Sequence, residues 1–117
     1  MLFKLAAVAV LLPLASAQFA YTYVYTTPTD WVSGQPANVS WTAEVGDPEQ
    51  YTLLLKIFNS TTNSEDNWVL AQGIDTYSYF ANFTLPDVVP ADGYFLLPVS
   101  VKDTSTEGPP SNKFSIA

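Results

Sequence analysis

The sequence predicts an all-β fold, a two-sheet β-sandwich of immunoglobulin or fibronectin type III character with about seven strands. After residue 17, apolar and polar residues alternate over short runs, and no window of helix length repeats its apolar residues at helical spacing. Turn residues such as Gly, Pro and Asp separate these runs at spacings of roughly ten residues. Both observations are typical of two packed antiparallel sheets, and a small β-barrel is the alternative.

The expected strands, in chain order, span residues 20–27, 37–44, 51–58, 68–71, 77–85, 94–102 and 113–116. The first run alternates Tyr21, Tyr23 and Tyr25 with smaller or β-branched residues and stops at Pro28. A row of aromatic residues on one strand face can fill a core or form a flat platform for sugar rings. We expect this row to pack in the core, since phenol hydroxyls reach the surface in either case.

The next two strands differ in how their faces alternate. In residues 37–44, Ala37, Val39 and Trp41 share the face that we expect to be buried. Residues 51–58 are so apolar that both faces of this strand are expected to be at least partly covered, with Lys56 marking the outer one. The polar stretch 59–67 predicts a loop or hairpin tip before the short strand 68–71.

The last three strands follow the same logic. In residues 77–85 the inward face is expected to be Tyr79, Ala81, Phe83 and Leu85. Pro98 cannot donate to a strand ladder, so residues 94–102 are expected at a sheet edge or a bulge. Phe114 and Ile116 are expected to point inward from the final strand.

Residues 1–17 read as a signal peptide. Lys4 supplies the positive start, residues 5–14 form a short apolar run, and small residues end at Ala17, so that cleavage would leave Gln18 first. The apolar run is about half as long as a bilayer-spanning helix, so we expect no membrane span. We therefore expect a secreted chain with one domain over residues 18–117.

Composition excludes most catalytic chemistry. The chain has 4 Lys+Arg, 11 Asp+Glu, no His and no Cys, which excludes Ser-His-Asp triads, Cys nucleophiles and His or Cys metal sites. Loss of Lys4 with the signal peptide leaves a net charge of −8, which disfavours nucleic acid and anionic lipid as partners. Because nearly all carboxylates fall in expected turns, we expect no enzymatic activity, no cofactor and no metal. A calcium site at Glu65, Asp66 and Asp75 is less favoured than a solvated loop.

Five positions are candidate surface sites. Asn38, Asn59 and Asn82 each begin an Asn-x-Ser/Thr sequon, so all three are glycosylation candidates in an exported chain. Trp31, in a turn, and Trp68, beside a polar loop, are the large aromatics most expected to be exposed and to bind a ligand. For each tryptophan the alternative is packing against the body of the sandwich.

The residues also resemble a known family. The pattern of Pro28, Trp31, Gly34-Gln35 and then Val39-Ser40-Trp41 is similar to the opening of the fungal cell-wall synthesis domain of the KRE/KNH type, also described as the Ser-Thr-rich GPI-anchored membrane family. Later segments fit in order: residues 51–58, Phe83-Thr84-Leu85-Pro86, Tyr94 with its apolar strand, and the closing residues 111–116. The resemblance implies a secreted Ig-like domain associated with the fungal wall and β-glucan assembly. Relatives with a Ser/Thr-rich stalk and a GPI signal continue further, so we expect a bare domain without an anchor.

Two functional hypotheses follow from these features. The first is a non-catalytic module, located outside the cell or in the wall, that binds β-glucan or a wall glycoprotein through aromatic stacking and hydroxyl hydrogen bonds. The alternative is a secreted protein-binding, effector-like module with no polysaccharide ligand, which the acidic surface and the absent anchor favour.

Overall fold

The computed structural model describes residues 22–103 and 106–117. The expected signal peptide over residues 1–17, its cleavage between Ala17 and Gln18, and Tyr21 lie outside the described residues. In chain order, the elements are β1 (Val24–Tyr25), β2 (Pro36–Thr42), β3 (Gln50–Asn59), β4 (Ser64–Asp75), the 3-10 helix η2 (Thr76–Ser78), β5 (Phe80–Thr84), β6 (Ala91–Val99) and β7 (Phe114–Ile116).

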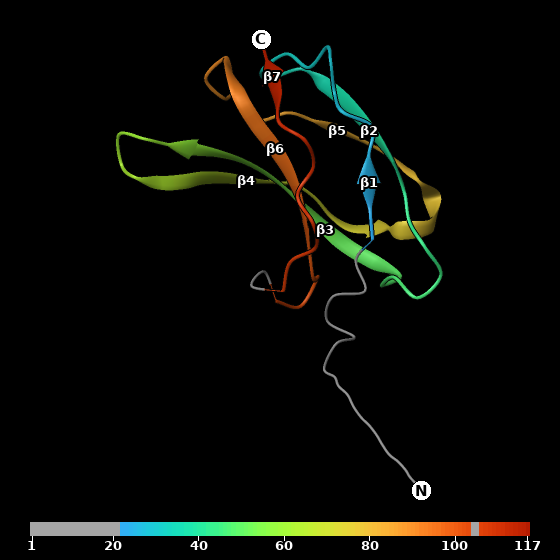
Figure 1. The fold of residues 1–117 in the computed structure, drawn as a ribbon. Coiled ribbons are helices and arrows are strands. Elements are labelled where there is room, and N and C mark those ends of the chain that lie inside the picture. Colours follow the sequence, from blue (N-terminus) through green and yellow to red (C-terminus); the bar gives the residue numbers. More distant parts are fainter. Residues whose placement is uncertain (1–21, 104–105) are drawn as a thin grey trace, which may run out of the picture.

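The strands form two sheets that face each other (Figure 1). The smaller sheet has the order β1-β2-β5 and the larger one has the order β4-β3-β6-β7, with every pair antiparallel. The two separate sheets match the expected Ig-like sandwich and not the alternative of a barrel.

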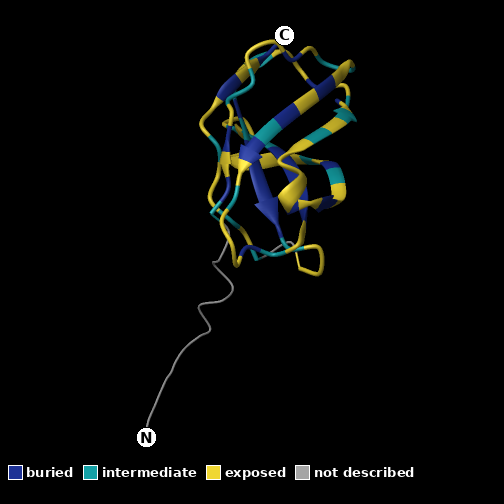
Figure 2. Ribbon diagram, turned by 90° about the vertical axis from the view of Figure 1, so that its right-hand side faces the viewer, coloured by how far each residue is buried: buried dark blue, intermediate teal, exposed yellow. Residues whose placement is uncertain are grey.

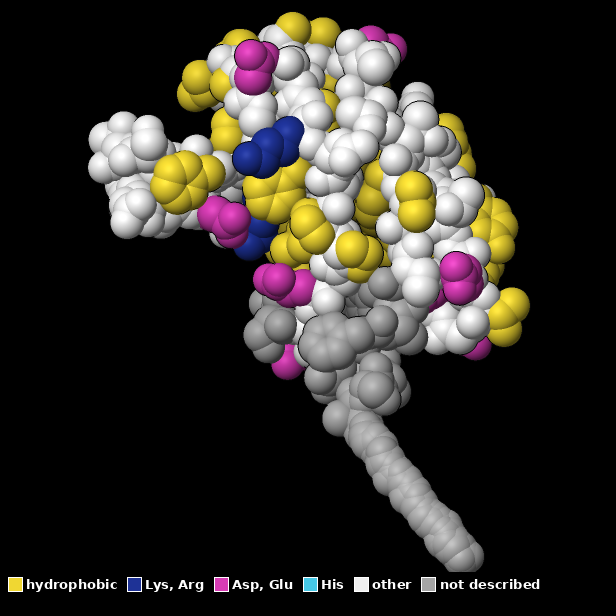
Figure 3. All heavy atoms as spheres, viewed as in Figure 1, with side chains coloured by type: hydrophobic (Ala, Val, Ile, Leu, Met, Phe, Trp, Pro, Cys, Tyr) yellow, Lys and Arg dark blue, Asp and Glu magenta, His cyan; other side chains and the backbone are white. Residues whose placement is uncertain are grey.

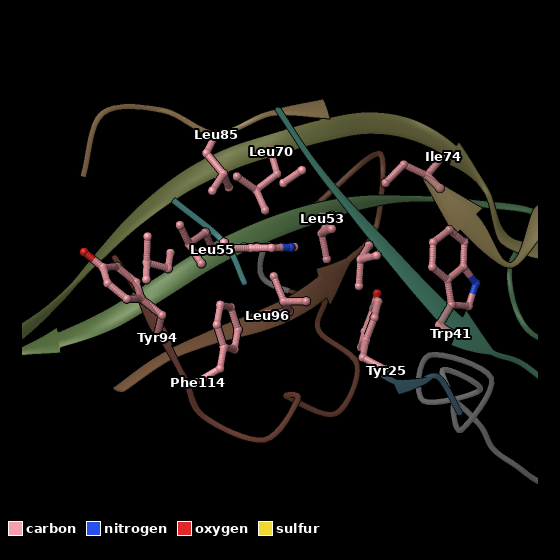
Figure 4. Close-up of a cluster of buried hydrophobic side chains, with 14 of the residues drawn as sticks. Tyr25, Trp41, Leu53, Leu55, Leu70, Ile74, Leu85, Tyr94, Leu96 and Phe114 are labelled. Atoms are coloured by element: carbon pink, nitrogen blue, oxygen red, sulfur yellow. The ribbon is translucent and has the colours of Figure 1, made fainter. Parts of the chain in front are cut away.

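The core lies between the two sheets, and buried and exposed positions alternate along the strands (Figure 2). Ala37, Val39 and Trp41 point inward from β2, as expected from their spacing. Tyr23 and Tyr25 are also buried, which confirms that the described part of the tyrosine row belongs to the core. Figure 4 shows the labelled core residues, with Tyr94 at one end of the cluster and Trp41 and Tyr25 at the other.

The polar stretch 59–67 is more regular than expected. Only residues 60–63 form the turn, and β4 already begins at Ser64. The expectation of a hairpin tip is confirmed at residues 60–63, but the expectation that the tip extends to Asn67 is wrong. Residues 64–67 of β4 pair with β3 through their backbone, and their side chains are exposed, so this part of the strand needs no apolar face.

Two other elements differ in detail from expectation. The segment expected to start a strand at Tyr77 forms η2 first, and Tyr79 then adopts a left-handed conformation with φ 61°, so Tyr79 is exposed rather than inward. Pro98 lies opposite Leu53 of β3. Its carbonyl accepts from Gly108 N–H on the other side, which is the side that lacks a regular strand partner. The expectation of an edge strand is therefore wrong for β6 as a whole, which lies between β3 and β7, but its end at Pro98 extends past β7, so the missing N–H of Pro98 breaks no pair with a neighbouring strand.

Candidate functional site: a cleft along the β3–β4 hairpin

The β3–β4 hairpin extends away from the body of the sandwich (Figure 1). β6 pairs with β3 only as far as the pair of Lys56 and Phe95. Residues 57–59 continue with β4 as their described sheet neighbour, so the end of the hairpin is a two-stranded ribbon. Figure 3 shows this ribbon standing off from the rest of the molecule at the left of the view.

The strand register decides which side chains face the body. Leu55 pairs with Trp68, and Ile57 pairs with Asp66. Residues paired across an antiparallel ladder share a face, and so do residues two apart on one strand. Because Leu55 is fully buried in the core, Trp68, Ile57, Asp66 and Asn59 lie on the same inner face of the hairpin.

A cleft of about 320 Å³ lies between this hairpin and the segment that leads into β6. Its volume is near the lower end of the range of about 300–1,000 Å³ that is usual for small-ligand sites. The residues that line it are Ile57, Phe58, Asn59, Ser60, Asp66, Trp68, Val89, Ala91 and Tyr94. The lining thus combines aromatic and aliphatic groups with a carboxylate, an amide and a hydroxyl.

Trp68 is an aromatic residue that is partly exposed in the cleft, and the buried Tyr94 ring packs against it. Their ring centroids are 6.2 Å apart with an interplanar angle of 51°, and Trp68 is half-buried against the core cluster. The Tyr94 hydroxyl donates to the Val89 carbonyl, which ties the segment before β6 to the core. Burial raises the pKa of Tyr94, and the nearby Asp66 carboxylate raises it further. Tyr94 is therefore neutral at physiological pH and holds one wall of the cleft in place.

The Asn59 side chain is oriented by hydrogen bonds at both of its polar atoms. Its Oδ1 accepts from the backbone N–H of Thr61 at 3.0 Å and of Thr62 at 3.4 Å. Its Nδ2 donates to Oδ2 of Asp66 at 3.2 Å. The backbone N–H groups on one side require the amide oxygen there, and the Asp66 carboxylate on the other side requires the NH₂ group, so the orientation of the amide is fixed. Nδ2 therefore points along the inner face of the hairpin toward Asp66.

The outer face of the same hairpin has a different chemistry. Glu65 pairs there with Phe58 across the strands, and Lys56 Nζ lies 3.1 Å from Glu65 Oε1. The Phe58 side chain is 54% exposed. The adjacent carboxylates Glu65 and Asp66 thus lie on opposite faces of the hairpin, and of these two only Asp66 lines the cleft.

Trp31 is buried, so the expectation that it is exposed is wrong. Only 5% of its surface is accessible, and its ring packs edge-on against Phe83 of β5 and Phe114 of β7, with centroids 5.5 and 5.2 Å away. Its Nε1–H donates to the Asn38 carbonyl at 3.1 Å. The residue folds back between the two sheets because a loop indole can bury its rings and still satisfy its N–H. Of the two tryptophans proposed to contact a ligand, only Trp68 lines the cleft.

The three sequon asparagines lie in two places. Asn38 and Asn82 are exposed and directly opposite each other on β2 and β5, on the outer face of the smaller sheet. Asn59 is partly buried at the rim of the cleft, on the other sheet. The outward phase expected for Asn38 and Asn82 agrees with their exposure.

The acidic residues in the described part of the chain do not converge on a metal site. Within residues 22–103 and 106–117, no group of three or more His, Cys, Asp or Glu side chains could hold a metal ion. Asp75 ends β4 and accepts from Tyr77 N–H at the start of η2, at the opposite end of the strand from Glu65 and Asp66. Asp47 is buried and accepts from Thr22 and from the backbone of Glu44, so it ties the segment before β1 to the turn before β3.

Sequence reasoning did not single out several exposed aromatic residues. These are Phe58 on the hairpin and Tyr77, Tyr79 and Phe80 between β4 and β5. Phe80 falls in the outward phase of its strand, so alternation alone could have indicated its exposure. Tyr79 could not have been found in this way, because its exposure depends on the left-handed turn that ends η2.

A sequence model of the Kre9/KNH-like N-terminal Ig-like domain matches residues 25–116. The chain belongs to the Kre9/KNH family. The match spans β2 to β7 and every residue of the hairpin cleft. This family is linked to fungal cell-wall glucan synthesis. No curated protein and no solved structure gave a significant match. None of the helices in the described part of the Kre9/KNH domain is long and apolar enough to cross a membrane.

Proposed function

We propose that this Kre9/KNH domain is a secreted, non-catalytic module that binds cell-wall β-glucan in the hairpin cleft. The observation that carries the proposal is the combination of the partly exposed Trp68, against which the buried Tyr94 ring packs, with Asn59, Ser60 and Asp66 around one cavity. The C–H faces of a sugar ring are apolar and stack on aromatic rings, whereas its hydroxyls require hydrogen-bond partners. A cleft with both kinds of group fits a short stretch of polysaccharide.

Two features support binding without catalysis. Hydrolysis of a glycosidic bond ordinarily uses a pair of carboxyl groups across the substrate, whereas the cleft is lined by one, Asp66. The neighbouring Glu65 is on the other face of the hairpin, where it pairs with Lys56. We therefore assign Asp66 to hydrogen bonding with sugar hydroxyls.

A depletion assay tests the proposal. The protein, freed of N-linked glycans, is incubated with insoluble β-1,3-glucan, β-1,6-glucan and chitin, and the loss from the supernatant is measured across polymer concentration. We expect saturable depletion by a β-glucan. Trp68→Ala should weaken it about tenfold or more, which corresponds to about 1.4 kcal/mol.

Matched variants separate the cleft from general surface effects. Asp66→Asn should weaken binding because the amide replaces a charged acceptor, while Glu65→Gln on the opposite face should leave it unchanged. Phe80→Ala removes an aromatic that is 48% exposed on the other sheet and should also have no effect. If no polymer depletes the protein, or if Phe80→Ala weakens binding as much as Trp68→Ala, the proposal is wrong. The first of these outcomes would direct attention to a protein partner.

A further inference from the structure

We infer that the first sugars of an N-linked glycan on Asn59 occupy the hairpin cleft, so that the chain's own glycan controls access to it. The inference rests on the secretion that is part of the proposed function, because N-glycans are added in the secretory pathway. It goes further by naming the occupant of the cleft and the residue that carries it.

The orientation of the Asn59 amide is the first step of the argument. An N-glycan is joined to Nδ2, and here Nδ2 points at Asp66 with a separation of 3.2 Å between Nδ2 and Oδ2. The carbonyl Oδ1 is held on the other side by the N–H groups of Thr61 and Thr62. A sugar attached to Nδ2 therefore starts on the inner face of the hairpin and not at its solvent-exposed tip.

The glycosidic linkage preserves this geometry. Glycosylation replaces one of the two hydrogens on Nδ2, so the other remains available for the bond to Asp66, and the sugar is joined at the second position, beside the line from Nδ2 to Asp66. The bonds from Thr61 and Thr62 use Oδ1 and are not affected. The same contacts that orient the free side chain can thus orient the modified one.

Asn59 and the aromatic wall of the cleft lie on the same face of the hairpin. Along the inner face of β4, Asp66 is followed two residues later by Trp68, about 7 Å further toward the core. A sugar ring joined to Nδ2 would start beside Asp66, on the face of the hairpin that also carries Ile57 and Trp68. Its apolar face would cover the indole and its hydroxyls would meet the carboxylate.

The other two sequons provide an internal contrast. Asn38 and Asn82 are exposed on the outer face of the smaller sheet, and neither lines the cleft. Glycans on these two residues would stand on a different surface from the cleft. A glycan on Asn59 should therefore behave differently from the other two when cleft residues are changed.

The decisive experiment uses the full secreted, glycosylated chain. Glycopeptide mass spectrometry first measures the occupancy of each sequon. The native protein is then treated with peptide N-glycanase, and the release of each glycan is followed over time. We expect the Asn59 glycan of the wild type to be released at least about tenfold more slowly than in Trp68→Ala, while release from Asn38 is equal in the two proteins. An unoccupied Asn59, or equal Asn59 release rates in the two proteins, would overturn the inference.

A second measurement uses Thr61→Ala, which removes the sequon but keeps the Asn59 side chain and its bond to Asp66. We expect this variant to bind β-glucan at least about fivefold more tightly than the glycosylated wild type. Asn38→Gln, which removes a glycan from the other sheet, should bind like the wild type. Equal binding by Thr61→Ala and the wild type would count against control by the glycan. If neither the wild type nor Thr61→Ala binds any polymer although Asn59 release depends on Trp68, the proposed function fails and the glycan inference stands.

Discussion

Replacement of Trp31 by alanine tests whether this residue serves the core or a ligand. The side chain is 5% exposed, and it bridges the two sheets through Phe83 and Phe114. Truncation of a buried tryptophan costs about 3–5 kcal/mol, because it removes apolar contacts and leaves a cavity. A domain of this size has a free energy of unfolding of about 5–15 kcal/mol, so the loss is a large fraction of the total. We expect Trp31→Ala to lower the Tm by at least about 12 °C.

A second substitution separates packing from hydrogen bonding. Trp31→Phe keeps an aromatic ring but removes the Nε1–H that donates to the Asn38 carbonyl at 3.1 Å. We expect it to cost about 1–3 kcal/mol, clearly less than Trp31→Ala. Both values follow from urea unfolding monitored by circular dichroism, with Phe80→Ala as the control at an exposed position. An unchanged Tm for Trp31→Ala together with lost glucan binding would refute the assignment of Trp31 to the core.

Two further predictions concern buried hydroxyls and a tight turn. The hydroxyls of Tyr25 and Tyr51 are buried next to each other and have no other hydrogen-bond partner among the described residues, and burial is the main cause that raises the pKa of each well above 10.0. As the pH rises, the unfolded chain therefore loses these two protons before the folded chain does, so this contribution to the free energy of unfolding is complete below pH 10 and falls above it by up to about 2.7 kcal/mol per pH unit. Urea midpoints measured across pH should show this fall. The double variant Tyr25→Phe with Tyr51→Phe should reduce the fall without destabilising the protein at pH 7. Gly34→Ala and Gly73→Ala should lower the Tm by similar amounts, because both glycines have positive φ, whereas the one close atom at Gly34, Asp87 Oδ1 at 2.6 Å from the new Cβ, ends an exposed side chain that can move aside. A clearly larger loss for Gly34→Ala would contradict this expectation.

Strand alternation predicted the fold well wherever a strand has one buried and one exposed face. In β2, the inward set of Ala37, Val39 and Trp41 followed directly from their spacing, and so did the outward position of Asn38. The inward orientation of Phe114 and Ile116 in β7 followed from their spacing in the same way. At these positions burial alternates with every second residue, so the local sequence is enough to predict it.

The position of Trp31 could not be read in the same way. It lies in a segment between strands, where no period indicates the direction of a side chain. Its burial depends on Phe83 and Phe114, which are distant in sequence and belong to different sheets. The family resemblance used Trp31 as a motif residue, but a motif does not distinguish a residue needed for packing from one needed for binding.

The cleft was partly foreseeable. Trp68 was singled out because it follows a polar stretch, and it does lie between the core and solvent. Its partners could not be deduced, because they come from β3, from β6 and from the segment before β6. The decisive detail, the hydrogen bond from Asn59 to Asp66, depends on the register of a hairpin whose turn the sequence placed too broadly.

The cleft exists because the two sheets differ in length. β3 and β4 have 10 and 12 residues, whereas β2 and β5 of the facing sheet have 7 and 5. At about 3.3 Å per residue, the longer hairpin extends well past the strands that could cover its inner face. Inside the sandwich that face carries Leu55, while beyond it the same face carries Asn59 and Asp66. The change from apolar to polar side chains along one strand face thus marks where the hydrophobic core ends, and Trp68 lies at that boundary, with one side packed against the core and the other available to a sugar.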